Sequence, residues 1–409
     1  MTGETTIARR PASALEDESS DPEHATVVHY VDPVTGTDGY LAVDGDTNPL
    51  AAGGFRVQAG LTAQTTMQLA RAMTQKQRLL GLSVDGAKCG LDLDPRDPGK
   101  HDAMRRFLRF LRPYLLDRYS MGPDMGTGWA EIEDLAQAEG ISSAKAAVAR
   151  AQGLSELDFL RRHALLSAEL GGATLGQRRA GHGLAHAALT AAEWSCASRD
   201  APLRVGIQGF GTLGRAAALG IVEAGLSVTA IADEHGCLYA EGGLPAEALL
   251  GAPPGTPLTL LAGSSGALAS PPYALLDCPV DLLVLAACED AMSAQQAHRL
   301  PDSVRAVVVG ANLGLSAEVE GVLHRRAVVV VPDVVGGCGG SASMHALFGP
   351  VACPTATEVL HSTGSMMREL VNRLLTIATP HAVTLRQAGL AVCAEQRHSA
   401  AARPYGPRT

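Results

Sequence analysis

One segment near the middle of the chain, residues 203–233, restricts the possible folds more than any other. It begins with a short β-branched run, RVGIQ, continues through a glycine-rich turn, GFGTLG, and enters an alanine-rich stretch that predicts a helix. Gly225 ends this helix, and the run LSVTAIAD predicts the next strand. Because a strand, a helix and a second strand in this order form a βαβ unit, we expect a parallel sheet.

The glycine turn has the spacing of a dinucleotide-binding turn. Gly209 allows a tight turn, Gly211 lets the backbone approach a pyrophosphate, and Gly214 lets helix and strand pack closely. Asp233 lies 24 residues after Gly209 and can accept a hydrogen bond from a ribose 2′-hydroxyl, which favours NAD over NADP. Glycines alone would indicate only a structural turn, but strand, helix and acid together favour a bound cofactor. We expect further cofactor contacts from Phe210, Thr212 and Leu213.

The flanking sequence predicts a two-domain α/β protein. Apolar runs such as VDLLVLAA, RAVVVGAN and AVVVVPD alternate with helix-like segments, which is typical of a doubly wound parallel sheet. Residues 26–43 predict a β-hairpin, and residues 62–80 a helix capped by Thr62. We expect a disordered tail at 1–25, an α/β substrate domain at 26–180, a Rossmann-type dinucleotide-binding domain at 181–345, and C-terminal helices at 346–409 that return to the substrate domain.

The composition excludes several classes of protein. The chain has 409 residues and a formal net charge of −9, which argues against a general polyanion binder. No apolar run is long enough to span a membrane, and the N-terminus lacks the apolar core of a signal peptide. Eight cysteines form no CxxC pair, so we interpret them as reduced thiols and expect no metal site. A cytoplasmic protein with a small-molecule substrate, and with no nucleic-acid or membrane partner, is expected.

Three polar residues in the first half are candidates for chemistry. Lys76 and Lys88 stand twelve residues apart in the stretch MTQKQRLLGLSVDGAKCG. Lys88 lies among small residues where a substrate can approach, and a lysine with a lowered pKa can act as a base near neutral pH. Asp124, in MGPDMGTG, lies in a turn bounded by proline and glycine. Each residue alone would be interpreted as a solvated surface charge.

The order of the sequence motifs further supports a chemical role for these three residues. GGFR, MTQK, DGAKCG, PDMGT, GFGTLG, GAN and PDVVGGCGG follow one another as in the glutamate/leucine/phenylalanine/valine dehydrogenases. The chain resembles this family over residues 27–345, and its short N-terminal region and the stretch DGDTNPLAAGGFRV look more similar to the leucine and phenylalanine members. The resemblance implies an NAD-dependent oxidoreductase acting on the CH–NH2 group of an L-amino acid, by deamination or by reductive amination of the 2-keto acid. It also implies a homo-oligomer, at least a dimer.

The resemblance also implies roles for single residues. Lys76 would pair with the substrate α-carboxylate, Lys88 would activate water against an imine carbon, and Asp124 would carry protons to and from the amino nitrogen. Hydride would move between the substrate Cα and C4 of the nicotinamide, in a cleft between the domains. The remaining implied contacts are Gly54 with the substrate, and Ala180, Ala287 and Asn312 with the cofactor.

Several positions depart from the family motifs. Asp85 replaces the first glycine of Gly-Gly-Ala-Lys; its carboxylate would raise the pKa of Lys88 if close, or it could point away. Ala180 replaces a threonine that contacts the nicotinamide amide, and Gly337 replaces an asparagine. The remaining departures are Cys89 and Cys338, which we interpret as small space-filling residues rather than catalytic thiols.

Two positions bear on the substrate. Ala52 stands where glutamate dehydrogenases have a lysine, and Met344 stands where they have a serine. Because a buried carboxylate without partners is costly, we expect an apolar or specialised amino acid as substrate rather than glutamate. Two alternatives stay open: a diverged enzyme that reduces an unusual imine or keto acid in a biosynthetic pathway, and a non-catalytic nucleotide-binding homologue. The joint presence of Lys76, Lys88 and Asp124 favours an enzyme.

Overall fold

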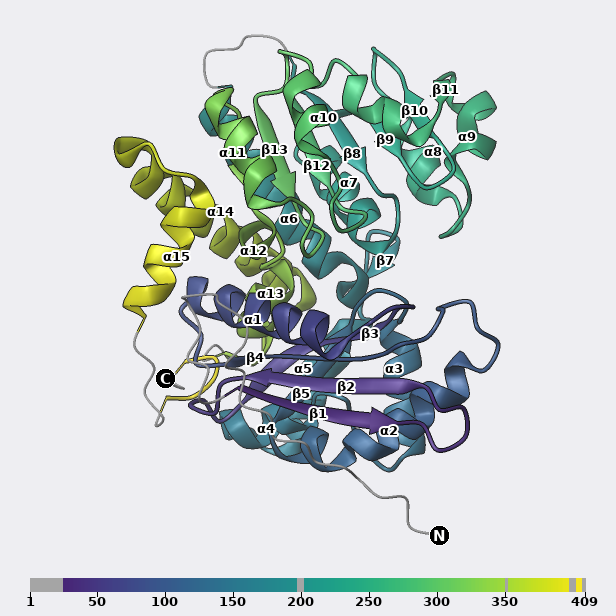
Figure 1. Ribbon diagram of the computed structural model, residues 1–409, viewed down its shortest axis with the longest axis vertical. Helices are drawn as coiled ribbons and strands as arrows, with labels where there is room; N and C mark the ends of the chain where they lie inside the picture. The colour runs from purple at the N-terminus through teal and green to yellow at the C-terminus, as the bar shows by residue number, and fades with distance from the viewer. Residues whose placement is uncertain (1–24, 197–201, 350–351, 397–401, 407–409) are drawn as a thin grey trace. The chain divides into compact units, whose positions relative to one another are not determined.

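The computed structural model describes residues 25–196, 202–349, 352–396 and 402–406. The chain divides into two compact α/β units (Figure 1). The first unit contains residues 1–163, 348–353 and 392–409, and the second contains residues 164–347 and 354–391. The α/β fold with two units agrees with the expectation from the sequence. The predicted disordered tail at 1–25 lies, apart from its last residue, outside the described residues.

The first unit is built on a five-stranded sheet with the order β1-β2-β4-β3-β5. β1 and β2 pair in antiparallel fashion and confirm the predicted hairpin. β3 runs parallel to β4 on one side and to β5 on the other. The strands are β1 Ala25–Val31, β2 Asp38–Asp44, β3 Ala51–Val57, β4 Asp85–Leu91 and β5 Tyr119–Pro123.

One face of this sheet packs against helix α2, Lys100–Asp117. Phe55, Cys89 and Met121 lie on that face and form one apolar core with α2 side chains such as Phe107. Because successive side chains of a strand point to opposite faces, the neighbours of these residues along each strand face the other side. The sheet therefore separates an apolar face from a face that carries polar side chains.

Helix α1, Ala63–Leu79, packs over the opposite face. Thr62 caps its start by accepting a hydrogen bond from Thr65 N, which confirms the predicted cap. A Cβ on Gly86 of β4 would lie 2.3 Å from Thr74 N, so a glycine there allows the helix to approach the strand closely. The remaining helices of this part of the chain are α3 Trp129–Ala138, α4 Ala146–Gln152 and α5 Glu156–Ala164.

The second unit contains a seven-stranded sheet with the order β11-β10-β9-β8-β12-β13-β14, and Figure 1 shows β8, β12 and β13 side by side. Five neighbouring strands, β9, β8, β12, β13 and β14, are parallel, as predicted for a doubly wound sheet. β10 and β11 are antiparallel and were not expected; only four residues join β9 to β10, which is too short for a parallel crossover. The strands are β8 Arg204–Gln208, β9 Ser227–Ala232, β10 Cys237–Tyr239, β11 Leu268–Ser270, β12 Leu282–Leu285, β13 Ala306–Val309 and β14 Val329–Val331.

Close helix contacts hold the second unit together through small residues. Gly181 of α6, Leu175–Ser195, faces Ala216 of α7, Thr212–Glu223, and a Cβ on Gly181 would lie 2.4 Å from the Ala216 Cβ. The other elements are β6 Glu169–Leu170, β7 Ala173–Thr174, α8 Ala246–Gly251, α9 Leu258–Ser265, α10 Ala294–Arg299, α11 Ala317–Arg325, α12 Asp333–Gly336, α13 Gly339–Phe348, α14 Ala356–His381 and α15 Leu385–Glu395, with short 3-10 turns at Leu165–Ser167 and Pro272–Asp277.

The long helix α14 belongs to the second unit. Its Gly364 approaches His186 of α6 so closely that a Cβ there would lie 2.6 Å from the His186 Nε2. The sequence led us to expect that residues 346–409 as a whole return to the substrate domain, whereas only residues 348–353 and 392–409 group with the first unit. Helical periodicity predicts that α14 has a buried face, but it does not identify the helix that covers that face.

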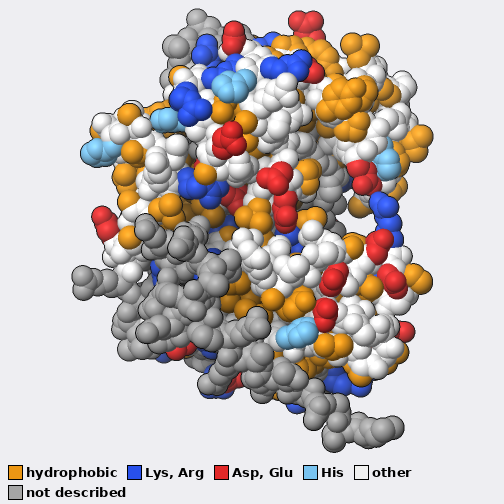
Figure 2. All heavy atoms as spheres, in the orientation of Figure 1, with side chains coloured by type: hydrophobic (Ala, Val, Ile, Leu, Met, Phe, Trp, Pro, Cys, Tyr) orange, Lys and Arg blue, Asp and Glu red, His pale blue; other side chains and the backbone are white. Residues whose placement is uncertain are grey.

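Charged side chains of both signs are scattered over the face of the molecule seen in Figure 2, without a large patch of one sign. Among the described residues, no helix combines the length and apolar character that crossing a bilayer requires.

Replacing Gly181 with alanine is expected to destabilise the protein. The new Cβ would lie 2.4 Å from the Ala216 Cβ and 2.6 Å from Leu213 O, and such overpacking costs about 1–3 kcal/mol. This cost should exceed the gain of about 1 kcal/mol in helix propensity. Gly251→Ala is the matched control, because no atom lies within 4 Å of its Cβ position. Thermal unfolding should show a lower Tm for Gly181→Ala only; equal Tm values would contradict the packing argument.

Candidate active site

Three buried charged side chains meet on the polar face of the first sheet. The Lys88 Nζ lies 2.5 Å from the Asp124 Oδ2, and the Arg56 Nε donates to the same oxygen at 2.8 Å. Lys88 and Arg56 are 3% and 1% exposed, and the Asp124 side chain is 14% exposed. They come from β4, from the turn after β5 and from β3, which are adjacent strands. The sheet therefore brings together residues that are far apart in the sequence.

The turn that carries Asp124 is fixed by its own hydrogen bonds. The Thr127 hydroxyl donates to Phe55 O at 2.7 Å, and Asp124 N donates to the Thr127 hydroxyl at 3.0 Å. Glycine at position 54 lets the two charged side chains pack closely against β3, because a Cβ there would lie 2.9 Å from the Asp124 Cβ and 3.2 Å from the Lys88 Nζ. The sequence predicted a substrate contact at Gly54, and the structure places this residue directly beside the two charged groups.

Burial and charge set the protonation of the cluster. Burial lowers the pKa of Lys88 because the ammonium loses its hydration; Asp124 opposes this effect, while Arg56 and Lys76 add to it. Burial alone would raise the pKa of Asp124, but Lys88 and Arg56 hold it well below its usual range. Asp124 is therefore a carboxylate at neutral pH, and Lys88 loses its proton more readily than a surface lysine.

Lys76 also belongs to this region. It lies on α1, its side chain is 4% exposed, and its charge acts on Lys88. Ala52 lies on β3, two residues before Gly54, and pairs with Ser120 of β5. The first unit thus contains Lys76, Lys88, Asp124, Gly54 and Ala52 on neighbouring elements, and their individual roles stay predictions.

Arg56 is the residue that the sequence did not assign. Arg56 stands in the motif GGFR. The sequence feature that could have identified it is a charged residue inside an otherwise apolar strand. A fully buried arginine needs a partner, because an isolated buried charge is very costly. Its bond to Asp124 shows that it supports the carboxylate of the cluster.

Asp85 points away from Lys88. Its carboxylate accepts hydrogen bonds from Asn48 N at 3.1 Å and from the Asn48 Nδ2 at 2.6 Å, and it pairs with the Arg118 guanidinium. Residues three apart on a strand lie on opposite faces, which explains why Asp85 and Lys88 do not meet. The departure from the glycine of the family motif is therefore structural, and of the two possibilities open from sequence the second is the one found.

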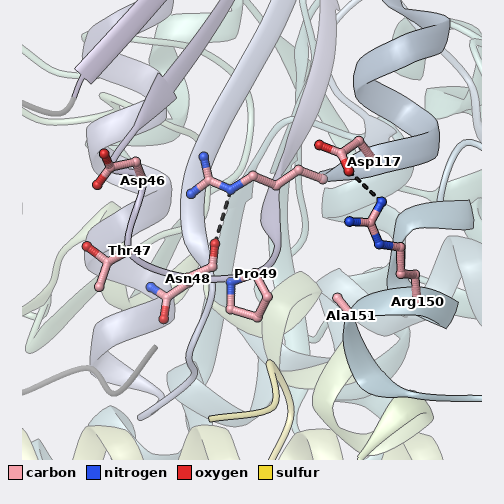
Figure 3. Close-up of a pocket in the computed structure, with 8 residues that line it drawn as sticks. Asp46, Thr47, Asn48, Pro49, Asp117, Arg150 and Ala151 are labelled. Carbon is pink, nitrogen blue, oxygen red and sulfur yellow. Dashed lines mark hydrogen bonds and ion pairs between the residues drawn. The ribbon is translucent and has the colours of Figure 1, made fainter. Parts of the chain in front are cut away.

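A hollow of about 450 Å³ lies beside Asn48 and is separate from the charged cluster (Figure 3). Arg118 donates from its Nε to Asn48 O at 3.1 Å, and Arg150 pairs with Asp117 at 2.5 Å. Much of the polar lining is thus already paired within the protein. The lining residues are Asp46, Thr47, Asn48, Pro49, Asp117, Arg118, Arg150 and Ala151, none of which was predicted to bind substrate.

Two cysteines that depart from the family motifs are both buried within their own units. Cys89 is fully buried, accepts a hydrogen bond from the Tyr119 hydroxyl at 3.3 Å, and burial raises the pKa of its thiol to about 12. Cys338 is buried and donates to Val334 O at 3.0 Å. A thiol that stays protonated is a poor nucleophile, so Cys89 is not suited to catalysis, and the burial of both residues is consistent with a space-filling role.

In the second unit, the glycine turn has the geometry of a pyrophosphate cradle. Gly209 has φ +91°, and a Cβ there would lie 2.8 Å from Ala286 O. A Cβ on Gly214 would lie 1.9 Å from Gly209 O, so only glycine fits. By contrast, no atom lies within 4 Å of the Cβ position of Gly211, which precedes the first residue of α7. The turn is closed where strand and helix pack and open where a phosphate would meet the helix N-terminus.

Two other predicted cofactor residues lie at the same edge of this sheet. Ala287 follows β12 and Asn312 follows β13, at the carboxyl ends of the strands, and the strand order reverses between β8 and β12. Ligands of doubly wound sheets bind at such a reversal. Phe210 lies in the turn, Thr212 and Leu213 begin α7, Ala180 lies on α6, and Met344 and Gly337 lie on or beside α13.

Asp233 is already engaged by the backbone. Its Oδ1 accepts from His235 N at 2.8 Å and from Gly236 N at 2.9 Å, and its Oδ2 accepts from Leu258 N at 2.7 Å. These bonds order the turn after β9 and hold the carboxylate at the carboxyl end of that strand. A carboxylate oxygen has two lone pairs, so a further bond from a ribose hydroxyl is chemically possible.

Family comparisons agree with this geometry. The family model "Glutamate/Leucine/Phenylalanine/Valine dehydrogenase" matches residues 171–403, and "Glu/Leu/Phe/Val dehydrogenase, dimerisation domain" matches residues 25–139. The chain belongs to this dehydrogenase family. It is therefore an amino-acid dehydrogenase, an oxidoreductase that uses a nicotinamide cofactor.

Three named proteins show which members of the family this chain is similar to. The chain is 29% identical to the NADP-specific glutamate dehydrogenase A1 of Halobacterium salinarum, over 73% of this chain and 68% of that protein. It is 26% identical to the NAD-specific glutamate dehydrogenase of Staphylococcus aureus (strain COL), over 74% and 70%. The hetero-hexameric glutamate dehydrogenase of Thermus thermophilus, in a leucine-bound form, superposes with a TM-score of 0.72 at 26% identity, over 91% and 88%. These relatives are named glutamate dehydrogenases, so the expected closeness to leucine and phenylalanine members is not what they show.

Removing the charge of Arg56 is expected to shift the pH dependence of this dehydrogenase. Arg56 lowers the pKa of Lys88, so Arg56→Gln should raise that pKa. If Lys88 acts as a neutral base, the rise of deamination with pH should then move to higher pH. The pH profile of kcat/KM measures this shift, and Arg109→Gln, which removes an exposed partner of Glu139, is the control. A shift to lower pH would contradict the electrostatic argument.

Proposed function

We propose that this protein is an NAD-dependent dehydrogenase that deaminates an L-amino acid other than glutamate and, in reverse, aminates the corresponding 2-keto acid. The observation that carries the proposal is the buried Lys88–Asp124 pair, at 2.5 Å, which packs closely against Gly54. Burial lowers the pKa of this lysine, as a general base requires, and Gly54 allows the pair to approach the strand closely.

Each charged residue has a separate task in this proposal. Lys76 holds the substrate α-carboxylate, and neutral Lys88 takes a proton from the water that attacks the imine carbon. Asp124 carries protons to and from the substrate nitrogen, and Arg56 orients its carboxylate. The bound nicotinamide supplies the hydride acceptor at its C4. Together, these groups place one cation, one base and one proton carrier around a single carbon atom.

The preference for NAD rests on the charges that follow β9. Asp233 and its neighbour Glu234 place negative charge where a 2′-phosphate would lie. Arg215, the basic residue of α7, is committed elsewhere: it donates to Ala252 O at 2.7 Å and lies over the Phe210 ring, 4.9 Å from its centroid. The two carboxylates would therefore repel a 2′-phosphate, and the Arg215 guanidinium would not be available to bind it.

The substrate preference rests on Ala52 and Met344. Neither side chain can neutralise the γ-carboxylate of glutamate, so an apolar or specialised side chain fits better. A substrate range nearer to that of leucine or phenylalanine dehydrogenases follows from this argument. The match to a dimerisation-domain model supports an oligomer, which we propose to be a homo-oligomer acting in the cytoplasm.

NADH is expected to bind at least tenfold more tightly than NADPH, a difference of about 1.4 kcal/mol. The physical reason is repulsion between Asp233 or Glu234 and the 2′-phosphate. Fluorescence titration of the purified protein with each nucleotide measures the two dissociation constants. Equal binding, or tighter binding of NADPH, would overturn the NAD preference.

Lys88→Ala and Lys76→Ala should have different consequences. Loss of the base should abolish turnover while NADH affinity stays nearly unchanged, because the lysine acts on the substrate. Loss of the carboxylate partner should mainly raise KM, since that contact exists in both ground and transition states. Lys100→Ala, which removes a partner of Glu131, is the control. Full activity of Lys88→Ala with the preferred amino acid would rule out the proposed mechanism.

A further inference from the structure

We propose that Arg386 is a positioning residue for the nicotinamide half of the bound cofactor. It acts through Asp333, whose carboxylate fixes the backbone of the loop that carries Asn312. The proposal rests on the proposed function, because it takes Asn312 as a cofactor contact. Arg386 lies on α15, at the end of the second unit's chain, and belongs to none of the sequence motifs described above.

The loop after β13 has a backbone conformation that its sequence does not favour. Leu313 has φ +55°, in the left-handed region that residues with a Cβ rarely adopt. Asp290, in the loop after β12, has φ +47°. Asp290 N donates to Leu313 O at 3.0 Å, and Ala291 N donates to Gly314 O at 2.8 Å. The loops after two neighbouring strands are therefore bonded to each other, with a strained leucine at the junction.

A buried carboxylate holds this strained leucine. Asp333 begins α12 and is 1% exposed, and its Oδ2 accepts a hydrogen bond from Leu313 N at 2.8 Å. A left-handed conformation of a residue other than glycine persists only where the surrounding structure holds it, and such strain is concentrated at ligand sites. Because Leu313 directly follows Asn312, the bond from Asp333 also restricts the position of Asn312.

Arg386 supplies the positive charge that the buried carboxylate needs. Its Nη2 donates at 2.6 Å to the Asp333 Oδ1, which is the oxygen that Leu313 does not use. The same guanidinium donates to the buried Glu320 of α11, from Nε at 2.9 Å and from Nη2 at 2.7 Å. Charge-assisted bonds of this kind are strong and directional. Arg386 therefore compensates two buried carboxylates and orients one of them toward Leu313.

The place of this loop on the sheet indicates which half of the cofactor it affects. Asn312 follows β13, whereas Asp233 follows β9, on the other side of the reversal in strand order between β8 and β12. In a doubly wound sheet, a dinucleotide lies across this reversal, with one mononucleotide on each side. Since Asp233 is proposed to bind the adenosine ribose, the loop of Asn312 belongs to the nicotinamide side.

The alternative role of Arg386 is structural, in which it would only fasten α15 to α11 and α12. Loss of a structural contact destabilises the unit as a whole and weakens both halves of the cofactor alike. Loss of a positioning contact weakens the nicotinamide half alone. ADP contains the adenosine and the pyrophosphate but lacks the nicotinamide riboside, so the affinities for NADH and ADP separate the two roles.

NADH binding is measured by fluorescence titration, and ADP binding by displacement of NADH, so that both report the same site. Arg386→Gln should weaken NADH at least tenfold and ADP less than threefold. Leu313→Gly in that background should restore part of the NADH affinity, because glycine adopts the left-handed conformation without penalty. Equal weakening of both nucleotides, or unchanged NADH binding, would overturn the proposal.

Arg204→Gln is the matched control. Arg204 is 27% exposed, against 24% for Arg386, and it also pairs with a buried carboxylate, that of Asp281. This pair lies at the amino ends of β8 and β12, away from the loops that follow the strands. Arg204→Gln should therefore leave the ratio of the two affinities within threefold of wild type. A tenfold change of this ratio in Arg204→Gln would overturn the assignment to Arg386.

Hydrogen–deuterium exchange tests the same contact without nucleotide. The amide of Leu313 should exchange at least tenfold faster in Arg386→Gln than in wild type, because its acceptor is no longer held in place. Arg204→Gln should not change this rate. Exchange at wild-type rate in Arg386→Gln would show that Asp333 holds the loop unaided, which contradicts the proposal.

A second variant keeps the proposal testable if Arg386→Gln does not fold. That variant leaves Asp333 and Glu320 as unpaired buried carboxylates, which is costly, and the double variant with Glu320→Gln removes one of the two charges. If the affinity ratio changes as expected but no amino acid is turned over, the proposed function fails and the positioning role stands. If amino acids are turned over but the ratio is unchanged, the inference fails and the proposed function stands.

Discussion

The buried ion cluster of Lys88, Asp124 and Arg56 is the interaction on which the first unit's chemistry depends. A lone ammonium with 3% exposure would be very unfavourable, and Asp124 makes it tolerable. Arg56 donates to the same Asp124 oxygen that pairs with Lys88, so the negative charge of this carboxylate is shared between two cations. Desolvation and Arg56 then act together to lower the pKa of Lys88 against the pull of Asp124. The cluster thus combines stability of the strand ends with a lysine that can give up its proton.

Glycine residues have the same structural role in both units, which is to allow close packing of neighbouring groups. Gly54 lets Lys88 and Asp124 pack closely against the first sheet, and Gly209 and Gly214 let a strand and a helix meet at the second sheet. In each case, absence of a Cβ allows groups with chemistry to approach closely. These close approaches therefore depend on the absence of a side chain at each of these glycine positions.

Departures from the family motifs fall into two groups. Asp85 and Cys89 belong to the apolar side of β4, where one pairs with Asn48 and Arg118 and the other fills the core. Such changes leave the reacting groups in place. Ala52 and Met344, in contrast, are the two departures on which the proposed substrate preference depends.

The sequence by itself determined the local elements: the β8–turn–α7–β9 unit, the β1–β2 hairpin and the cap at Thr62 all follow from periodicity and short-range hydrogen bonding. It also determined the candidates Lys88 and Asp124, through motifs of a few residues. Only the tertiary structure decided that Arg56 belongs beside them, because strand order and not sequence distance sets its neighbours. The direction of Asp85 and the packing of α14 on α6 were decided there as well. Strand and helix periods specify which face a side chain is on, but the partner across that face is fixed only when distant segments pack together.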